Sequence, residues 1–258
     1  MNKKIYIVVL VMIFLTACNR PEIKDKEEKV DITVSAAASM TDSLLELKKN
    51  FEKTNPNIQV NYNFGGSGTL RKQIEQGAPI DLFLSASESD YQLLNEKGVI
   101  TEGKAILQNQ LVLIKPENGD IESLSDLEGL DGKIAIGTPD AVPAGTYAKQ
   151  ALETGGLWGK LHDHIVFTKD VRQVLTFVKE GSVDAGFVYR SDMIQEDKIQ
   201  LVEEIDSSYH TPIRYYLGII DHHRDEEKKE AVGSFFSYVT SVQNMELFMK
   251  YGFKDIHD

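Results

Sequence analysis

The sequence predicts an α/β protein of two lobes, with mixed, mostly parallel sheets flanked by helices. Short apolar segments alternate with amphipathic ones from residue 31 onwards, which is typical of strands and helices in α/β proteins. This part of the chain is long enough for two lobes of ordinary size. The pattern breaks near Asn109 and Thr211. These breaks predict lobe 1 at residues 31–109 and 212–258 and lobe 2 at residues 110–211, with a hinge and a ligand cleft between them.

Each expected element rests on its hydrophobic period or its end signals. The expected strands cover residues 31–34, 58–63, 81–86, 110–115, 133–137, 165–168, 184–189, 199–205 and 213–220. The expected helices cover residues 41–51, 69–77, 88–97, 123–127, 146–153, 171–180, 225–240 and 243–251. In the first helix, either Ser39 or Thr41 is placed as the N-cap. One face of that helix carries Leu44, Leu45, Leu47 and Phe51.

The N-terminus has the pattern of a bacterial lipoprotein leader. Lys3 and Lys4 precede a short apolar run, and small residues precede Cys18, so residues 1–17 are expected to be a cleaved signal peptide. Cys18 is then the lipidated first residue, which anchors the protein to the outer face of the cytoplasmic membrane. It is the only cysteine, so disulfides are excluded. Residues 18–30 are polar and mixed in charge, and they predict a tether.

The charge balance limits the kinds of partner. The formal net charge is −12, which argues against nucleic acid, because binding nucleic acid requires a basic surface. A small anion would gain nothing from the overall field of such a protein. An anion site here must therefore depend on local hydrogen-bond donors.

Small residues recur where a strand or loop leads into a helix, which is the geometry of an anion site. Taken singly, each place is more typical of a plain loop, a helix start or a half-buried aromatic. Ligands of α/β sheets bind beyond the carboxyl ends of strands, so these places are expected to converge. The expected donors are the hydroxyls of Ser39, Ser67 and Tyr189 and the backbone N–H groups near Ala86, Ala144 and Val171. All are neutral, which suits a fully ionised oxyanion.

Other chemistries find little support in the sequence. Gly65-Gly66-Ser67-Gly68-Thr69 is not a nucleophile elbow, and it lacks the ending of a P-loop. The spacing of the histidines does not place two imidazoles on one helical face. They are interpreted as solvated loop residues: His162, His164, His222 and His223. Acidic residues at expected caps and strand starts (Asp81, Asp170, Asp184) define no catalytic pair. We therefore expect no enzyme, no protein-bound metal and no cofactor.

Several blocks in order resemble the molybdate-binding proteins of ABC importers, over residues 32–254. The matching motifs are Ala36-Ala37-Ala38-Ser39-Met40-Thr41, Ser67-Gly68-Thr69-Leu70-Arg71-Lys72-Gln73-Ile74, Gly77-Ala78-Pro79-Ile80-Asp81-Leu82-Phe83-Leu84-Ser85-Ala86, Val142-Pro143-Ala144-Gly145-Thr146-Tyr147-Ala148, Asp170-Val171-Arg172, Val188-Tyr189-Arg190-Ser191-Asp192 and Lys250-Tyr251-Gly252-Phe253. The resemblance implies a type II periplasmic-binding-protein fold. It also implies that molybdate or tungstate, whose metal is present only within the oxyanion, is held between the lobes.

The resemblance carries the family's ligand contacts over position by position. They fall on the serines Ser39 and Ser67, the main-chain amides of Ala144 and Val171, and Tyr189. Ala86 falls beside the site. Gly65 and Gly66 depart from the pattern, because some members have serines or other small side chains there. The resemblance implies a monomer that delivers its ligand to a membrane permease. Three alternatives stay open: a receptor for sulfate or thiosulfate, a hydrolase with Ser39 or Ser67 as nucleophile, and a structural lipoprotein.

Overall fold

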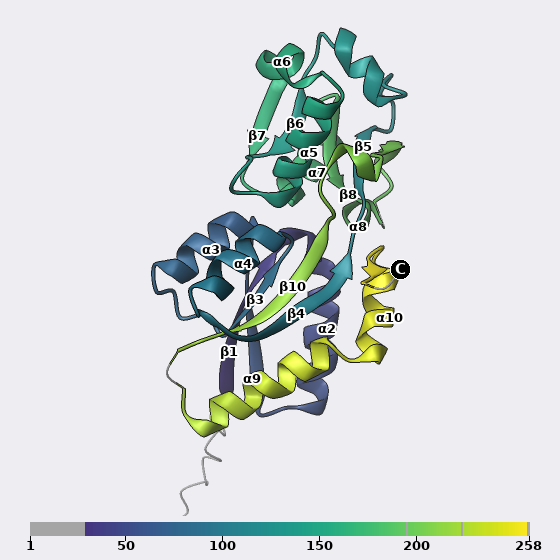
Figure 1. Ribbon diagram of the computed structural model, residues 1–258. Helices are drawn as coiled ribbons and strands as arrows, with labels where there is room; N and C mark the ends of the chain where they lie inside the picture. The colour runs from purple at the N-terminus through teal and green to yellow at the C-terminus, as the bar shows by residue number, and fades with distance from the viewer. Residues whose placement is uncertain (1–28, 195, 223, 257–258) are drawn as a thin grey trace, which may run out of the picture.

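The computed structural model describes residues 29–194, 196–222 and 224–256 (Figure 1). The expected signal peptide, Cys18 and most of the expected tether lie outside the described residues. Two sheets, each with its own helices, form two bodies joined by two chain crossings. We call the body with the six-stranded sheet lobe 1 and the body with the five-stranded sheet lobe 2. Among the described residues, no helix has both the length and the apolar character needed to cross a bilayer.

The sheet of lobe 1 mixes parallel and antiparallel strands. β1 pairs in parallel with β2 and β3, whereas β10 runs antiparallel to β3 and β4, and β11 antiparallel to β4. The strands in spatial order are β11 (Lys254–Asp255), β4 (Ile100–Gln108), β10 (Arg214–Ile220), β3 (Leu82–Ser85), β1 (Val30–Ala37) and β2 (Ile58–Gly65). β4 and β11 were not expected from the sequence.

Helices cover both faces of this sheet. In β3, Leu82 and Leu84 join one hydrophobic cluster and Phe83 joins another, because successive strand residues point to opposite faces. The first cluster includes residues of α2 (Thr41–Thr54), α9 (Glu226–Val239) and α10 (Val242–Lys250). The second includes residues of α3 (Ser67–Glu75) and α4 (Glu88–Glu96). Both α3 and α4 lie near lobe 2 (Figure 1).

Lobe 2 is built around a second mixed sheet. β6 pairs in parallel with β7 and β8, and β5 runs antiparallel to β8 and β9. The strands in spatial order are β7 (Ile165–Thr168), β6 (Ile134–Gly137), β8 (Ala185–Tyr189), β5 (Leu111–Pro116) and β9 (Ile199–Glu204). The helical segments are η2 (Leu124–Gly129), α5 (Pro143–Thr154), α6 (Trp158–Leu161), η3 (His162–His164), α7 (Val171–Lys179), α8 (Arg190–Met193) and η4 (Ser207–Tyr209).

Both sheets are mixed, with less parallel pairing than the sequence predicted. The chain leaves lobe 1 after β4 and returns into β10, and these two strands are antiparallel neighbours (Figure 1). On the lobe 2 side, β5 and β9 are antiparallel neighbours for the same reason. Two adjacent crossings in opposite directions therefore force antiparallel pairs beside the hinge.

The start of α2 differs from the expectation. The strand β1 continues to Ala37, and a 3₁₀ turn, η1 (Ala38–Met40), leads directly into the helix. The N-cap of α2 is Met40, without a side-chain cap, so neither Ser39 nor Thr41 caps it. The 3₁₀ turn continues directly into the helix, and Thr41 N–H bonds to Ala38 O. Leu45 is 49% exposed, so it lies outside the buried face of α2.

Candidate functional site

The carboxyl ends of strands in both lobes meet around one small cavity. Its volume is about 10 Å³, which is room for about one water molecule. A larger ligand would require the walls to move apart. The lining residues are Ala37, Ala38, Ser39, Gly65, Gly66, Ser67, Ala86, Val142, Pro143, Ala144, Val171 and Tyr189. All six residues that the sequence singled out are among them. None of the described residues that line the cavity carries a charge.

Ser67 forms part of the lobe 1 wall, as the first residue of α3. It is fully buried, and Ala86 N–H donates a 3.0 Å hydrogen bond to its Oγ. This differs from the expectation that the Ala86 N–H group faces the ligand directly. Because the oxygen already accepts one bond, the hydroxyl hydrogen of Ser67 is left to donate elsewhere. Ala86 thus orients Ser67 as a donor.

Ser39 is supported by a buried network that the sequence did not reveal. Its Oγ lies 2.8 Å from the hydroxyl of Tyr215 on β10. Asn109, between β4 and β5, donates through Nδ2 to that hydroxyl at 3.2 Å and to Ser191 Oγ at 2.8 Å. Since Tyr215 accepts from Asn109, its own hydrogen can go to Ser39, which leaves the Ser39 hydrogen free. A polar residue at the lobe boundary was the only sequence sign of this network.

Lobe 2 contributes the beginnings of two helices. Ala144 follows Pro143, which occupies the first position of α5. Val171 is the first residue of α7, and the expected cap is confirmed, because Asp170 accepts a 2.9 Å bond from Gln173 N–H. The first N–H groups of a helix have no acceptor within the helix, and the helix dipole makes this end positive. These backbone amides can therefore bind an anion without a cationic side chain.

Tyr189 closes the lobe 2 wall at the end of β8. The residue is 1% exposed, and its hydroxyl has no hydrogen-bond partner among the described residues. Burial raises the pKa of Tyr189 well above its usual value, so the phenol keeps its proton and can donate. An unpartnered buried hydroxyl costs about 1–3 kcal/mol. A ligand oxygen in the cavity would satisfy it.

Two ionisable side chains lie close in sequence to the cavity walls, and each contacts another group of the protein. Arg172, next to Val171, forms an ion pair with Asp42 of lobe 1 at 3.0 Å. Asp192 is fully buried and accepts the Tyr189 N–H at 3.0 Å through Oδ2. Burial raises the pKa of Asp192 to about 7, although Tyr189 N–H and Arg172 oppose the shift. Neither residue lines the cavity.

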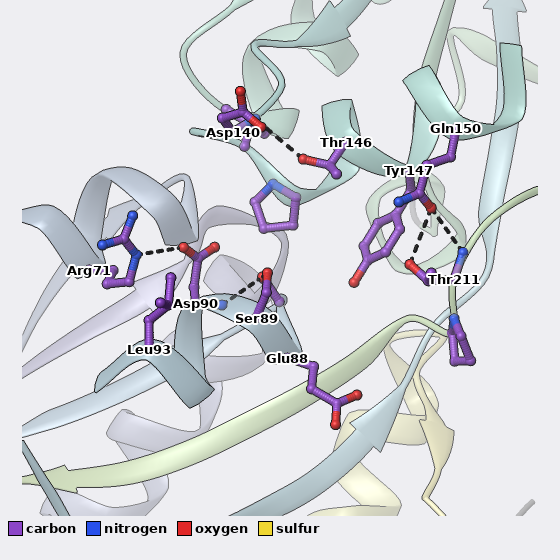
Figure 2. A pocket seen from close by; sticks show the side chains of 14 residues that line it. Arg71, Glu88, Ser89, Asp90, Leu93, Asp140, Thr146, Tyr147, Gln150 and Thr211 are labelled. Carbon is purple, nitrogen blue, oxygen red and sulfur yellow. Dashed lines mark hydrogen bonds and ion pairs between the residues drawn. The ribbon is translucent and has the colours of Figure 1, made fainter. Parts of the chain in front are cut away.

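A larger pocket of about 630 Å³ adjoins the cavity and shares Val142 and Pro143 with it (Figure 2). Its lobe 1 side includes Arg71, which bonds to Asp90 at 2.8 Å. Tyr147 of α5 lines the pocket from lobe 2, and its hydroxyl donates to the carbonyl of Ala86 at 3.3 Å. This bond joins the two lobes beside the cavity. Val142 and Pro143 are the residues that line both spaces, and Tyr147 lines the outer pocket alone.

The histidines that the sequence singled out differ in their surroundings where the structure describes them. His164 Nδ1 lies 2.7 Å from Gly132 O, and His162 is largely exposed. His222 is not simply solvated, because its Nε2 lies 3.1 Å from the buried carboxylate of Asp81. His223 lies outside the described residues. Within the described part of the chain, the hydrogen-bond partners of the Ser39 and Ser67 hydroxyls are Tyr215 and Ala86, and neither is a histidine.

Two lobes around a small cavity built from helix beginnings define a two-lobed solute-binding protein. The chain matches the family of bacterial extracellular solute-binding proteins over residues 32–254 and belongs to it. It is 44% identical over 233 residues to a protein of Bacillus subtilis (strain 168) named as an ABC transporter substrate-binding lipoprotein, covering 89% of this chain and 88% of that one. It is 34% identical over 230 residues to the molybdate-binding protein ModA of Haemophilus influenzae, covering 86% and 89%.

A solved structure supports the fold. The periplasmic molybdate-binding protein of Azotobacter vinelandii superposes with a TM-score of 0.76 at 26% identity, covering 86% of this chain and 98% of that one. The resemblance inferred from the sequence motifs is thus confirmed. The family binds solutes for transport and is not a class of enzymes.

Proposed function

We propose that this protein captures molybdate or tungstate between its lobes and delivers it to the membrane permease of an ABC importer. The observation that carries the proposal is the cavity itself, which has only uncharged donors and one buried hydroxyl, that of Tyr189, without a partner. A fully ionised tetrahedral oxyanion presents acceptors in every direction and needs such donors. The ligand contacts are assigned to Ser39, Ser67, Ala144, Val171 and Tyr189, with Ala86 orienting Ser67.

The energetics are sufficient for capture. A hydrogen bond to a charged group contributes about 1.5–3 kcal/mol. The five assigned donors therefore supply on the order of 10 kcal/mol before ordering and desolvation costs, which is compatible with micromolar or tighter binding.

Selectivity follows from what the cavity lacks. Phosphate carries a proton near neutral pH, and no carboxylate lines the described cavity to accept it, so that proton would stay unpaired. Sulfate has shorter bonds to oxygen than molybdate and would make longer contacts to donors that had separated to fit the larger ion. The names of the relatives in Haemophilus influenzae and Azotobacter vinelandii favour the same ligand.

The cellular setting is part of the proposal. Cleavage before Cys18 and lipidation of that cysteine would tether the protein to the outer face of the cytoplasmic membrane. The name of the Bacillus subtilis relative supports this lipoprotein state. Lobe closure would present both lobes of a single protein molecule to the permease.

Titration calorimetry with molybdate, tungstate, sulfate and phosphate tests the proposal. We expect micromolar or tighter binding of molybdate and tungstate, weaker binding of sulfate and none of phosphate. Ser67→Ala should abolish or strongly weaken binding, whereas Ser125→Ala, at an exposed serine of lobe 2, should not. Tight sulfate binding with weak molybdate binding would make the protein a sulfate-type receptor. No binding of any oxyanion would leave the structural lipoprotein.

A further inference from the structure

One loop of lobe 2 is seated directly on a helix of lobe 1. The loop that joins β6 to α5 contains Asp140 and Ala141, and Asp140 has a positive φ of 67°. The carbonyl of Ala141 accepts the N–H of Gly68 at 3.1 Å and that of Thr69 at 3.4 Å. Both N–H groups belong to the first turn of α3, where helix amides have no internal acceptor. A lobe 2 carbonyl therefore occupies part of the positive end of α3.

Two glycines permit this close approach. A Cβ atom built at Gly66 would lie 2.4 Å from Ala141 O, and one at Gly68 would lie 2.5 Å from Asp140 O. In both cases the obstacle is the backbone of the other lobe, which cannot rotate away as a side chain can. Within lobe 1 itself an alanine would be accepted. Gly66 has an ordinary extended conformation (φ −68°, ψ 134°), and Gly68 lies inside a helix, where alanine is more favourable than glycine.

The neighbouring Gly65 shows that the constraint is local. A Cβ there would lie 3.3 Å from Leu70 Cδ2, a flexible side chain of the same lobe. The lack of a side chain therefore has a different consequence at each of these two residues. At Gly66 a side chain is excluded by lobe 2.

This contact sits next to the proposed ligand donors. Ser67 lies between the two glycines, and Ala144 follows Ala141 by three residues at the start of α5. The position of the Ala141 carbonyl on α3 thus fixes the separation of a lobe 1 donor and a lobe 2 donor across a cavity of only about 10 Å³.

We propose that Gly66 and Gly68 are positioning residues that set the closed arrangement of the lobes, by letting the Ala141 carbonyl seat on the first turn of α3. The inference rests on the proposed oxyanion binding for its effect on affinity. A methyl group at either glycine would hold the lobes apart, so the state that binds tightly would be less populated. Apparent affinity falls in proportion to that population.

The test compares Gly66→Ala and Gly68→Ala with Gly233→Ala. Gly233 is a helical glycine of α9 in lobe 1, where an added Cβ meets nothing within 4 Å. Calorimetry gives the dissociation constant for molybdate, and stopped-flow measurement of tyrosine or tryptophan fluorescence gives the dissociation rate. Small-angle X-ray scattering with and without molybdate gives the radius of gyration, which a merely structural defect would not alter in a folded protein.

We expect Gly66→Ala and Gly68→Ala to bind molybdate at least about tenfold more weakly, mainly through faster dissociation. Scattering is measured with and without molybdate, and the wild type is more compact in one of these two conditions. In that condition, the radius of gyration of both variants should exceed that of the wild type. The melting temperature of the ligand-free Gly68→Ala protein should equal or exceed that of the wild type. Gly233→Ala should match the wild type in affinity and in radius of gyration.

The outcomes separate the two proposals. A wild-type protein that binds none of the oxyanions would defeat the proposed function, and the scattering comparison would still decide the role of the glycines. Affinities and radii of gyration in Gly66→Ala and Gly68→Ala equal to those in Gly233→Ala would overturn the inference.

Discussion

If the proposed function is correct, the two ends of strand β3 stabilise a negative charge in opposite ways. At the N-terminal end, the carboxylate of Asp81 is fully buried and lies 2.9 Å from Arg224 Nε and 3.1 Å from both Lys228 Nζ and His222 Nε2. It also accepts the N–H of Thr33 at 2.8 Å. At the C-terminal end, Ala86 borders a cavity in which no described lining residue is charged.

The difference follows from whether the anion stays. Asp81 is part of the chain, so its cationic partners never lose it. A ligand must leave, and buried cations around an empty cavity would be left without a counter-charge, at a cost of several kcal/mol. Neutral hydroxyls and helix amides carry a much smaller penalty when the cavity is empty. An exchangeable anion is therefore better served by neutral donors.

The largest expected effect concerns the permanent anion. Asp81→Asn leaves Arg224, which is itself largely buried, without its carboxylate, and should lower the free energy of unfolding by about 3 kcal/mol. Urea denaturation measures this. Asp184→Asn is the control, because Asp184 also accepts a backbone N–H at a strand start, that of Lys133, but is exposed. Molybdate affinity should stay unchanged in both variants. Equal losses of stability in the two variants would contradict the role given to the Asp81 cluster.

A second test concerns Asp192, the buried carboxyl closest in sequence to the cavity wall. Burial raises its pKa to about 7 in the folded protein, against about 4 in the unfolded chain. The folded state therefore holds this proton more tightly, so the stabilising contribution is complete below pH about 4 and is lost as the pH rises through about 7.

Asp192→Asn should remove this dependence. Between pH 5 and 7.5, the free energy of unfolding of the wild type should fall relative to that of the variant by about 2 kcal/mol. Urea denaturation at the two pH values measures the difference. Parallel pH profiles for the two proteins would show that Asp192 keeps an ordinary pKa.

A third test removes the unpartnered donor of the cavity. Tyr189→Phe should weaken molybdate binding by about 1.5 kcal/mol, roughly tenfold, because one bond to a charged ligand is lost. It should leave the ligand-free protein as stable as the wild type or more so, since the deleted hydroxyl has no partner among the described residues. Calorimetry and thermal melting measure the two effects. Tyr62→Phe, which removes a hydroxyl bonded to Leu44 O, should leave affinity unchanged; a Tyr189→Phe protein with wild-type affinity would refute the assignment.

The smallest expected effect concerns the ion pair between the lobes. Arg172 and Asp42 are partly exposed, and such pairs contribute about 0.2–1 kcal/mol, less at high salt. Asp42→Asn should therefore weaken molybdate binding less than about fivefold in dilute buffer, and less still in 0.5 M NaCl. Calorimetry at both salt concentrations measures it. A loss of affinity larger than that of Tyr189→Phe would show that charge, and not neutral hydrogen bonding, holds the ligand.

Much of the fold was predictable because hydrophobic period and helix ends are local. The expected helices at 88–97 and 171–180 agree closely with α4 and α7. β4 was missed because residues 101–104 are exposed and include a glycine, so the strand shows little alternation and exists by pairing with β10. The low share of parallel strand pairs could not be predicted from the sequence either, since it depends on where the chain crosses between the lobes.

For the site, residue types at strand ends predicted which residues would come together. They could not predict the contacts between distant segments that orient them. Tyr215, which contacts Ser39, lies 176 residues from it along the chain. The Ala86 N–H group donates a hydrogen bond to Ser67 Oγ. The need for a glycine at residue 66 could not be predicted either, because it comes from contact with a backbone carbonyl of the other lobe.

A crystal structure of the protein with molybdate tests the central claim most directly. We expect the ion in the cavity, with its oxygens within hydrogen-bond distance of Ser39, Ser67 and Tyr189 and of the amides at Ala144 and Val171. No lysine or arginine nitrogen should contact it. A lysine or arginine in contact with the ion, or an ion bound away from Ser67 and Tyr189, would contradict the claim that neutral donors alone hold the ligand.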